Sequence, residues 1–220
     1  MTDFETILRE DSRFALTETQ RDLMVRYRDL VLAENEVQNL TRLTSPEDFA
    51  YSHILDAVEL VRRVELDYPV MDLGSGAGVP GIPAAILDGR EWVLSDSELS
   101  KLQFLGRVAT QLGLAPRVQA IAGRADAVLD RAKPAVKSVV SRAVGPVSRI
   151  YPWIQRCSTW NTLVLLKGPR WDEEWEAFRG SAFRKDLEIL ATHEYSAPDP
   201  REGTQKTRKL VVLRRPLARG

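Results

Sequence analysis

The chain has one cysteine, Cys157, among its 220 residues, which excludes an internal disulfide framework. Only two histidines are present, so we expect no metal site. Basic and acidic side chains number 31 each, and a net charge of zero gives no global sign of a nucleic-acid partner. No apolar run is long enough to span a bilayer, and the N-terminus lacks a secretory signal pattern. A cytoplasmic protein without membrane contact is therefore expected.

The length and composition are those of one globular domain with a small appendage. A chain of 220 residues can bury roughly 70% of its unfolded surface. Residues 1–64 have helical periodicity, and two helix starts are recognisable within them. Thr17 and Gln20 form a capping box, and Ser45 precedes Pro46 as an N-cap precedes the first helical residue. We predict an N-terminal helical appendage over 1–64 and a second part over 65–220, packed as one structural unit.

A glycine-rich loop follows the first apolar run at residues 70–73. Four glycines come next, Gly74, Gly76, Gly78 and Gly81. Pro80 and Pro83 suit the first turn of a helix, where a missing N–H costs nothing. The pattern predicts a strand, a tight turn and a helix N-terminus, whose free N–H groups favour polar or anionic ligand groups.

The acid before the glycines indicates which ligand this loop binds. Residues 76–81 match G-x-G-x-x-G, which by itself is a weak dinucleotide signal. A carboxylate at Asp72 would repel a pyrophosphate, whereas it would attract the ammonium and sulfonium of S-adenosylmethionine. Asp-x-Gly-x-Gly-x-Gly resembles the first motif of class I methyltransferases. We therefore predict that Asp72, Gly74, Gly76 and Gly78 bind S-adenosylmethionine.

Strands and helices alternate after residue 70, as in a parallel α/β sheet. The predicted strands cover residues 70–73, 92–96, 117–121, 137–141, 161–166, 187–195 and 208–214. The last two have no helix-length insert between them, so they should pair antiparallel. We predict a Rossmann-like class I methyltransferase fold, with a mostly parallel seven-stranded sheet and a C-terminal antiparallel hairpin.

Three polar positions end predicted strands at the edge where open α/β sheets bind ligands. Asp96 lies 22 residues after Gly74 and can accept hydrogen bonds from both ribose hydroxyls. Arg124 and Asp126 follow the third strand, where Asp126 can accept a bond from the adenine amine. Either acid could instead be a first-turn residue of a helix.

Ser141-Arg142-Ala143 closes the predicted fourth strand, without the Asn/Asp-Pro-Pro-aromatic loop of enzymes that methylate exocyclic amines. Cys157 is expected inside a helix as a core residue, so a cysteine nucleophile is also missing. What remains is a target atom that is already nucleophilic, such as a ring nitrogen. The rate of methyl transfer would then come from the alignment of this atom with the methyl group. The alternative for Arg142 is a surface ion pair.

Basic side chains are concentrated late in the chain. The last twenty residues contain one acid, Glu202, and seven basic residues, Arg201, Lys206, Arg208, Lys209, Arg214, Arg215 and Arg219. Together with Arg124, Arg142 and Lys167 they can contact RNA phosphates, although basic tails are often only solvated surface. His53 and Asp56 lie three apart on one helix face, which favours a hydrogen bond that serves packing.

The ordered motifs resemble the RsmG family, also called glucose-inhibited division protein B, bacterial methyltransferases of guanine N7 in small-subunit ribosomal RNA. The matching segments are Asn39-Leu40-Thr41, His53-Ile54-Leu55-Asp56, residues 72–83, Asp96-Ser97, Phe104-Leu105, Arg124, Ser141-Arg142-Ala143, Lys167-Gly168 and Arg208-Lys209-Leu210. Ser100 stands where the family usually has a basic residue, so only Lys101 remains there, and Asp126 replaces a common glutamate.

The resemblance implies a set of site residues. S-adenosylmethionine contacts are implied at Gly74, Val79, Ala125, Asp126 and Arg142. Arg142 and Lys167 are assigned to catalysis, and the expected RNA contacts are Lys101, Arg124, Arg142, Lys167 and Arg208. The implied target is N7 of guanine 527, in the 530-loop region of 16S rRNA, presented by the RNA, the 30S subunit or an assembly intermediate.

Two other functions remain open at this point. One is a nicotinamide-dependent oxidoreductase, which depends on the G-x-G-x-x-G match alone. The other is an assembly factor that binds S-adenosylmethionine or rRNA without turnover. For the methyltransferase we expect a monomer.

Overall fold

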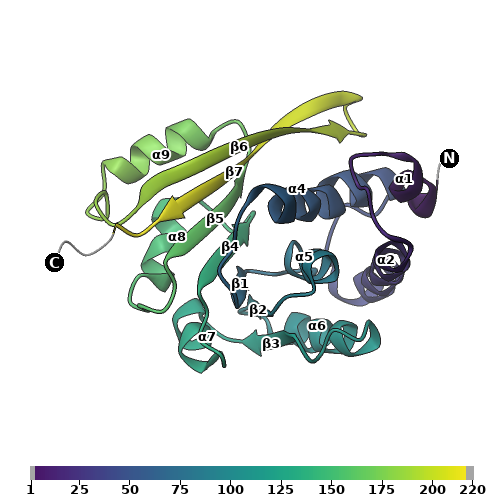
Figure 1. Cartoon of the computed structure of the whole chain (residues 1–220), viewed down its shortest axis with the longest axis horizontal. Helices are drawn as coiled ribbons and strands as arrows, with labels where there is room; N and C mark the ends of the chain where they lie inside the picture. The colour runs from purple at the N-terminus through teal and green to yellow at the C-terminus, as the bar shows by residue number, and fades with distance from the viewer. Residues whose placement is uncertain (1–2, 217–220) are drawn as a thin grey trace.

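The computed structural model describes residues 3–216, and these form one seven-stranded sheet with helices on both faces (Figure 1). The strands are β1 (Val70–Leu73), β2 (Trp92–Asp96), β3 (Val118–Ala122), β4 (Ser138–Arg142), β5 (Thr162–Lys167), β6 (Glu188–Asp199) and β7 (Thr204–Arg214). The helices are α1 (Phe4–Glu10), α2 (Glu18–Gln38), α3 (Pro46–Phe49), the π-helical η1 (Ala50–Ile54), α4 (Leu55–Arg63), α5 (Gly81–Asp88), α6 (Leu99–Gln111), α7 (Ala125–Arg131), α8 (Val147–Ile154) and α9 (Trp171–Arg179).

The sheet has the order β3-β2-β1-β4-β5-β7-β6. Strands β1 to β5 are parallel, and β7 lies antiparallel between β5 and β6. The predicted fold class, a mostly parallel sheet closed by an antiparallel hairpin, is therefore confirmed. Chain order reverses between β1 and β4, so their carboxyl ends open the crevice in which such sheets bind ligands.

Several predicted boundaries differ from the observed ones. The third, fourth and fifth strands each begin one residue later than predicted. The hairpin strands are longer than predicted, because β6 continues to Asp199 and β7 begins at Thr204. Helix α9 was not predicted, since only Trp171 and Phe178 of its nine residues are buried.

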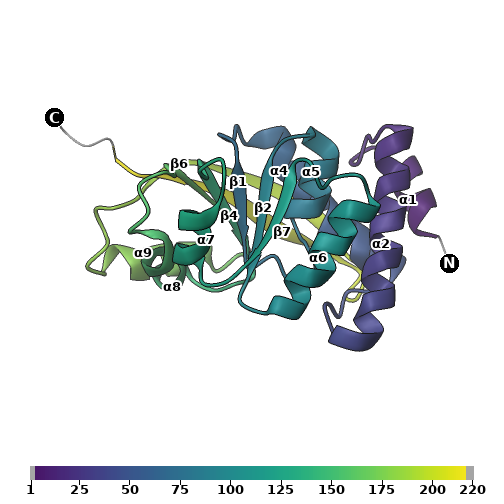
Figure 2. The same cartoon turned by 90° about the horizontal axis from the view of Figure 1, so that it is seen from below.

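Helices lie on both faces of the sheet (Figure 2), and one apolar cluster is buried on each face. Helices α7, α8 and α9 pack on one face through residues such as Val128, Ile150 and Phe178. Helices α4, α5 and α6 cover the other, and α1 and α2 lie outside α5 and α6 (Figure 1). Tyr27 and Phe49, which come from the N-terminal segment, belong to the same buried cluster as residues of the sheet. The hydrophobic core is therefore continuous across the boundary between 1–64 and 65–220. The division at that boundary stays a prediction.

The N-terminal helices begin where the sequence predicts. Thr17 accepts from the Gln20 N–H, and Gln20 returns a bond to the Thr17 N–H. Ser45 accepts from the Asp48 N–H, and Pro46 occupies the first helical position of α3. Both predicted caps are confirmed.

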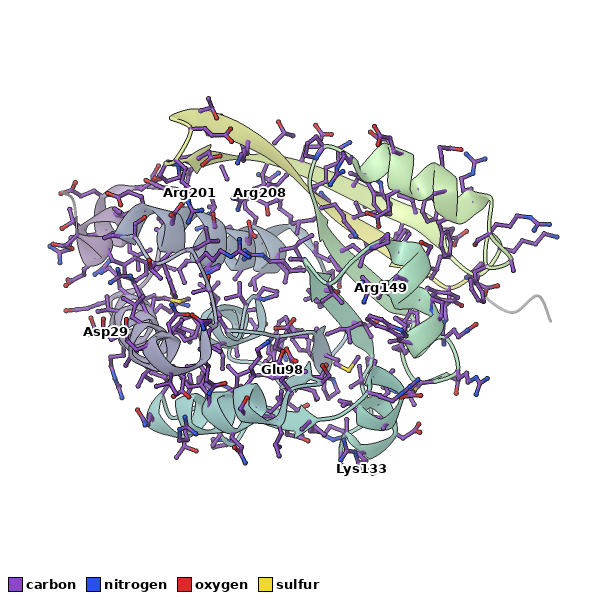
Figure 3. The ribbon with its side chains drawn as sticks, turned by 180° about the vertical axis from the view of Figure 1, so that it is seen from behind. Asp29, Glu98, Lys133, Arg149, Arg201 and Arg208 are labelled. Atoms are coloured by element: carbon purple, nitrogen blue, oxygen red, sulfur yellow. The ribbon has the colours of Figure 1, made fainter. Side chains whose placement is uncertain are left out.

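The hairpin of β6 and β7 reaches across the N-terminal helices, where Arg201 and Arg208 are seen in Figure 3. Arg201 Nε lies 3.0 Å from Asp48 Oδ2, and Arg208 Nη1 lies 2.5 Å from Asp56 Oδ1. The other late basic residues with intramolecular partners are Lys206 with Asp199, Lys209 with Asp172 and Glu194, and Arg215 with the end of α8. Arg219 lies outside the described residues. These five residues are thus paired within the protein and are not merely solvated surface, and their contact with RNA phosphates stays a prediction.

Cys157 differs from its prediction. Helix α8 ends at Ile154, and Cys157 lies beyond it, partly exposed, with Sγ 3.2 Å from Thr159 Oγ1.

Within residues 3–216, none of the helices has both the length and the apolar character that crossing a membrane requires.

Candidate active site

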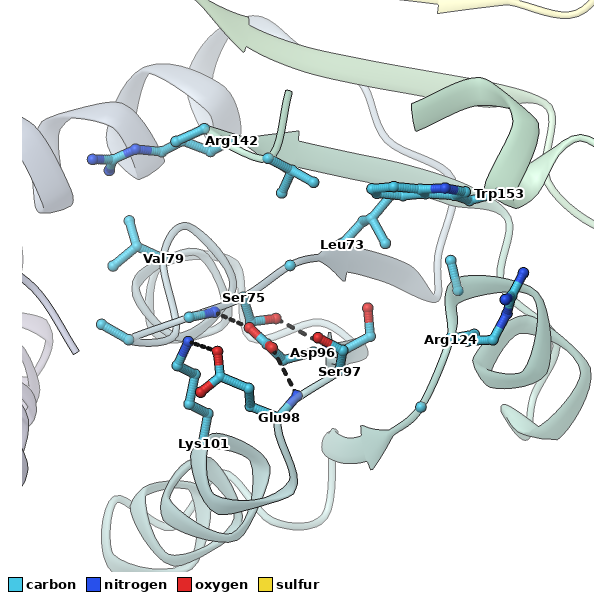
Figure 4. Close-up of a pocket in the computed structure, with 18 of the residues that line it drawn as sticks. Leu73, Ser75, Val79, Asp96, Ser97, Glu98, Lys101, Arg124, Arg142 and Trp153 are labelled. Atoms are coloured by element: carbon cyan, nitrogen blue, oxygen red, sulfur yellow. Dashed lines mark hydrogen bonds and ion pairs between the residues drawn. The ribbon is translucent and has the colours of Figure 1, made fainter. Parts of the chain in front are cut away.

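A cavity of about 790 Å³ lies at the carboxyl ends of β1, β2, β3 and β4. Its wall includes Gly74, Gly76, Val79, Asp96, Ala125, Asp126 and Arg142, together with Arg124 and Lys101. In Figure 4, Arg142 and Trp153 lie on one side of the cavity, and Asp96, Glu98 and Lys101 lie on the other. A volume of this size suits a ligand such as a nucleoside cofactor. Local sequence motifs and fold thus bring most of the predicted cofactor residues together.

The glycine loop is packed too tightly for side chains at Gly74, Gly78 and Gly81. Gly78 has a φ of +100°, and an added Cβ would lie 2.8 Å from Leu105. At Gly81 it would lie 2.4 Å from Leu94 and 2.8 Å from Asp72 Oδ2. Gly78 does not line the cavity, so the structure gives this predicted cofactor residue a packing role. Its neighbours Ala77 and Val79 line the cavity in its place.

Asp96 ends β2 with its carboxylate fixed at the cavity wall. One oxygen accepts from the Gly76 N–H at 3.1 Å, and the other accepts from the Glu98 N–H at 3.0 Å (Figure 4). These bonds hold the carboxylate against the glycine loop. Each carboxylate oxygen has a further lone pair, which can accept a ligand hydroxyl.

Asp72 lies beneath the loop and does not line the cavity. Its side chain is fully buried, and Oδ2 accepts from the Gly81 N–H at 3.0 Å, whereas Oδ1 has no partner among the described residues. Burial raises the pKa of Asp72 to about 7, against the lowering effect of the Gly81 N–H. Asp72 was predicted to contact the ligand directly. The structure corrects this prediction, because the buried carboxylate joins β1 to the first turn of α5.

The third strand leads into the part of the site around α7. Arg124 precedes this helix, and its side chain is 82% exposed, with Nε 3.5 Å from Asp126 Oδ1. The Ala127 N–H, which donates to Asp126 at 2.9 Å, lowers the pKa of that carboxyl. Asp126 is thus an acid in the first turn of α7, which was the alternative to a ligand contact, and it also lines the cavity.

Trp153 is a cavity residue that was not among the site residues predicted from the sequence. It projects from α8 to the cavity wall, and the guanidinium of Arg149 lies 5.5 Å from its ring centroid. The available signal was weak, because Trp153 comes eleven residues after the strand end at Arg142, next to the last residue of the following helix. An aromatic face beside Ala125 can cover a planar ligand group.

The N-terminal segment also contributes to this cavity. The Tyr27 hydroxyl donates to the Ala77 carbonyl at 2.8 Å, which ties α2 to the glycine loop. Thr41 and His53 line the wall, and His53 Nε2 lies 3.1 Å from Thr41 Oγ1. Burial, aided by the positive charge of Arg142, lowers the pKa of His53 to about 3. His53 is therefore neutral at physiological pH.

Arg142 lies on the wall between this cavity and a second one of about 740 Å³. Lys167 and Arg208 line the second cavity. Lys167 Nζ donates to the Gly145 carbonyl at 2.8 Å and lies 2.8 Å from Glu174 Oε1. The predicted catalytic and RNA-contacting residues thus fall into two groups, with Lys101 and Arg124 at the first cavity, Lys167 and Arg208 at the second, and Arg142 at both.

The predicted hydrogen bond between His53 and Asp56 is absent. Asp56 binds Arg142 and Arg208, whose side chains come from β4 and β7. The prediction is wrong because it considered only the residues of one helix, while charged partners come from distant strands. The surface ion pair considered for Arg142 is also wrong, since its side chain is 17% exposed and its partner Asp56 is buried. Among residues 3–216, no group of three or more His, Cys, Asp or Glu side chains could hold a metal ion.

Comparison with known proteins identifies one family. Residues 20–202 match the family model GidB, described as rRNA small subunit methyltransferase G. A protein of that name from Pseudomonas paraeruginosa is 30% identical over 203 residues, which cover 91% of this chain and 89% of the relative. Another from Solibacter usitatus is 33% identical over 176 residues, covering 79% of this chain and 82% of the relative.

Solved structures share the fold at low sequence identity. TrmK from M. capricolum, determined with S-adenosylhomocysteine, superposes with a TM-score of 0.54 at 9% identity, covering 73% of this chain and 68% of that one. A protein from Pyrococcus horikoshii, proposed to be an RNA methyltransferase, gives a TM-score of 0.52 at 13% identity over 88% of this chain and all of its own.

Proposed function

Because this chain belongs to the GidB family, rRNA small subunit methyltransferase G, we propose that it methylates N7 of guanine 527 in the 530-loop region of 16S rRNA. The protein is an S-adenosylmethionine-dependent rRNA methyltransferase, and the atom and position are the part that we propose. The family assignment replaces the nicotinamide oxidoreductase alternative. The observation that carries the finer proposal is Arg142, which lies on the wall shared by the two cavities.

The first cavity fits S-adenosylmethionine in size and in donors. The backbone of Gly74, Gly76 and Val79 lies along one wall, and tight packing at Gly78 and Gly81 keeps the loop in that shape. We assign Asp96 to the ribose hydroxyls, because its carboxylate is already oriented by two backbone N–H groups. A loop fixed before binding loses little conformational freedom when the ligand enters.

The remaining wall residues fit the adenine and methionine ends of S-adenosylmethionine. Ala125 and Asp126 flank the adenine position, with Trp153 as its aromatic cover. Arg142 faces the other end, where it can pair with the methionine carboxylate. The bound cofactor supplies an electrophilic methyl group on a sulfonium.

Guanine N7 carries a free lone pair, so the protein's task is alignment. We assign Arg142 and Lys167 to holding the target base, since both line the second cavity and neither is more than 17% exposed. Their N–H groups can donate to the O6 atom while leaving N7 free. Asp56 and Glu174 pair with these cations and offset the positive charge that the purine gains on methylation.

The remaining cations are assigned to the RNA backbone. Arg124 is largely exposed at the first cavity, and Lys101 lies across from it beside Glu98. Arg208 lines the second cavity. Phosphate contacts position an RNA without reading its sequence. We propose that a monomer acts in the cytoplasm on the 30S subunit or an assembly intermediate.

The test is methylation of small-subunit rRNA in a strain that lacks the gene. Borohydride and aniline cleavage followed by primer extension reports the N7 mark, and we expect its loss in the deletion strain. Wild-type protein restores it, Arg142→Ala does not, and Arg179→Ala restores it because Arg179 is an exposed residue of α9 paired with Glu176. Persistence of the mark without the gene contradicts the proposal. Rescue of subunit assembly by a folded but inactive Arg142→Ala protein would support the non-catalytic assembly factor.

A further inference from the structure

Asp56 belongs to the N-terminal helical segment, and so far it has been described only as a charge partner of Arg142 and Arg208. It lies in the first turn of α4 and is 3% exposed. Oδ1 accepts from the Tyr195 hydroxyl at 2.8 Å and from Arg208 Nη1 at 2.5 Å. Oδ2 lies 3.1 Å from Arg142 Nη1. One buried carboxylate therefore joins α4 to β4, β6 and β7.

The two guanidiniums are held by acceptors from the same N-terminal segment. Arg142 donates to the Ser52 carbonyl. Arg208 donates to the Tyr51 carbonyl at 2.9 Å and to Ser52 Oγ at 3.2 Å. The neutral acceptors orient these groups, but only the carboxylate balances charge between two cations that would otherwise repel each other. Asp56 is thus the group that allows both guanidiniums to lie side by side.

This cluster forms part of the wall of the second cavity. Asp56, Arg142, Tyr195 and Arg208 all line it, and Arg142 also lines the first cavity. The two arginines and the carboxylate leave one excess positive charge, while Lys167 on the same wall is paired with Glu174. An anionic or strongly hydrogen-bonding group of the RNA nucleotide therefore meets a fixed cation at this wall.

We propose that Asp56 is a positioning residue for methyl transfer, which holds Arg142 and Arg208 in the geometry that presents the target nucleotide to the methyl donor. The inference rests on the proposed function. It gives the N-terminal segment a part in the reaction in addition to its packing role. Small displacements of a positioning group can cost much of the rate, because alignment supplies most of the catalysis here.

A second ion pair with a buried carboxylate provides a control, although its arginine is more exposed. Asp48 also comes from the N-terminal segment, is buried, and binds an arginine of the C-terminal hairpin, Arg201, at 3.0 Å. It lines neither cavity. If the pairs only fastened the hairpin to the helices, the same substitution would have the same effect at both positions.

The experiment compares Asp56→Glu with Asp48→Glu, since each keeps the charge and lengthens the side chain by one methylene. Methyl transfer from S-adenosylmethionine to 30S subunits is measured with the full chain, and thermal melting checks the fold. We expect kcat to fall roughly tenfold or more for Asp56→Glu, with the KM for 30S subunits within about threefold of wild type. For Asp48→Glu we expect a kcat within about twofold.

The outcomes separate the inference from the function. A folded Asp56→Glu protein with wild-type kcat, or an equal loss in both variants, would overturn the positioning role. A wild-type protein that transfers no methyl group to rRNA would overturn the proposed function instead. If Asp56→Glu unfolds, Asp56→Asn combined with Arg208→Gln keeps the net charge of the cluster. Its kcat should then lie at least fivefold below that of Arg208→Gln alone, and equal values would reject the proposal.

Discussion

Replacing Asp72 by asparagine should stabilise the protein at neutral pH. The carboxyl is fully buried, its Oδ1 has no partner among the described residues, and burial raises its pKa from 3.8 to about 7. Asparagine has nearly the same shape and keeps a carbonyl oxygen for the Gly81 N–H. The variant therefore removes the ionisation while it leaves the hydrogen bond to α5 in place.

The sign and size follow from the two pKa values. Below about pH 4, Asp72 is protonated in the folded and the unfolded chain, so its ionisation costs no stability. Between about pH 4 and pH 7 the unfolded carboxyl ionises first, and wild type loses about 1.4 kcal/mol per pH unit relative to the variant. Above pH 7 the difference levels off at about 4 kcal/mol, which is an upper value because the new amide NH₂ also lacks a partner.

Urea unfolding followed by circular dichroism at pH 5, 6.5 and 8 measures this difference. Asp29→Asn, at an exposed position of α2, serves as the control and should change the free energy of unfolding by less than about 0.5 kcal/mol. A difference between Asp72→Asn and wild type that does not grow with pH, or a less stable variant at pH 8, would refute the reasoning. The first result would mean that Asp72 is not buried as described, and the second that its charge is compensated.

Three further substitutions test the loop and its supports. Gly81→Ala should cost about 1–3 kcal/mol in thermal unfolding because its Cβ meets Leu94 and Asp72, whereas Gly106→Ala in the open part of α6 should gain up to about 1 kcal/mol. Equal effects would contradict the steric argument. Asp96→Ala should weaken S-adenosylmethionine binding roughly tenfold to a hundredfold in calorimetry, through loss of a charged acceptor, and an unchanged Kd would remove the ribose assignment. Tyr27→Phe should lower the free energy of unfolding by about 1–2 kcal/mol, because the buried Ala77 carbonyl loses its donor. A neutral result in urea unfolding would show that water replaces the hydroxyl.

The parallel strands and the cofactor loop could be predicted because their signals are local. Buried parallel strands are recognisable as continuous apolar runs. The glycine loop comes directly after β1, and Asp96 and Arg142 are the last residues of β2 and β4. The extra length of the hairpin could not be predicted, since residues 196–207 are mostly polar, and their strand pairs (196–199 with 204–207) form only within this segment. Helix α9 escaped prediction for a related reason, because most of its residues face solvent.

The parts of the site that the sequence missed depend on contacts between distant residues. Asp72 looked like a ligand contact, but its orientation under the loop is set by the Gly81 N–H and the packing of α5. Tyr27 reaches the loop over 50 residues of chain, and Asp56 meets Arg208 over 152. No short pattern records such pairs. From the sequence, Asp56 was paired with His53 on its own helix, and Arg208 was assigned to RNA.

The last hairpin has a consequence for synthesis of the chain. The glycine loop and strands β1 to β5 are complete by Lys167, whereas Tyr195 and Arg208, which meet Asp56, are translated later. A nascent chain therefore contains most residues of the first cavity before it contains the hairpin residues of the second. The second cavity thus takes shape only after the hairpin has been added and has docked on the buried carboxylate of Asp56.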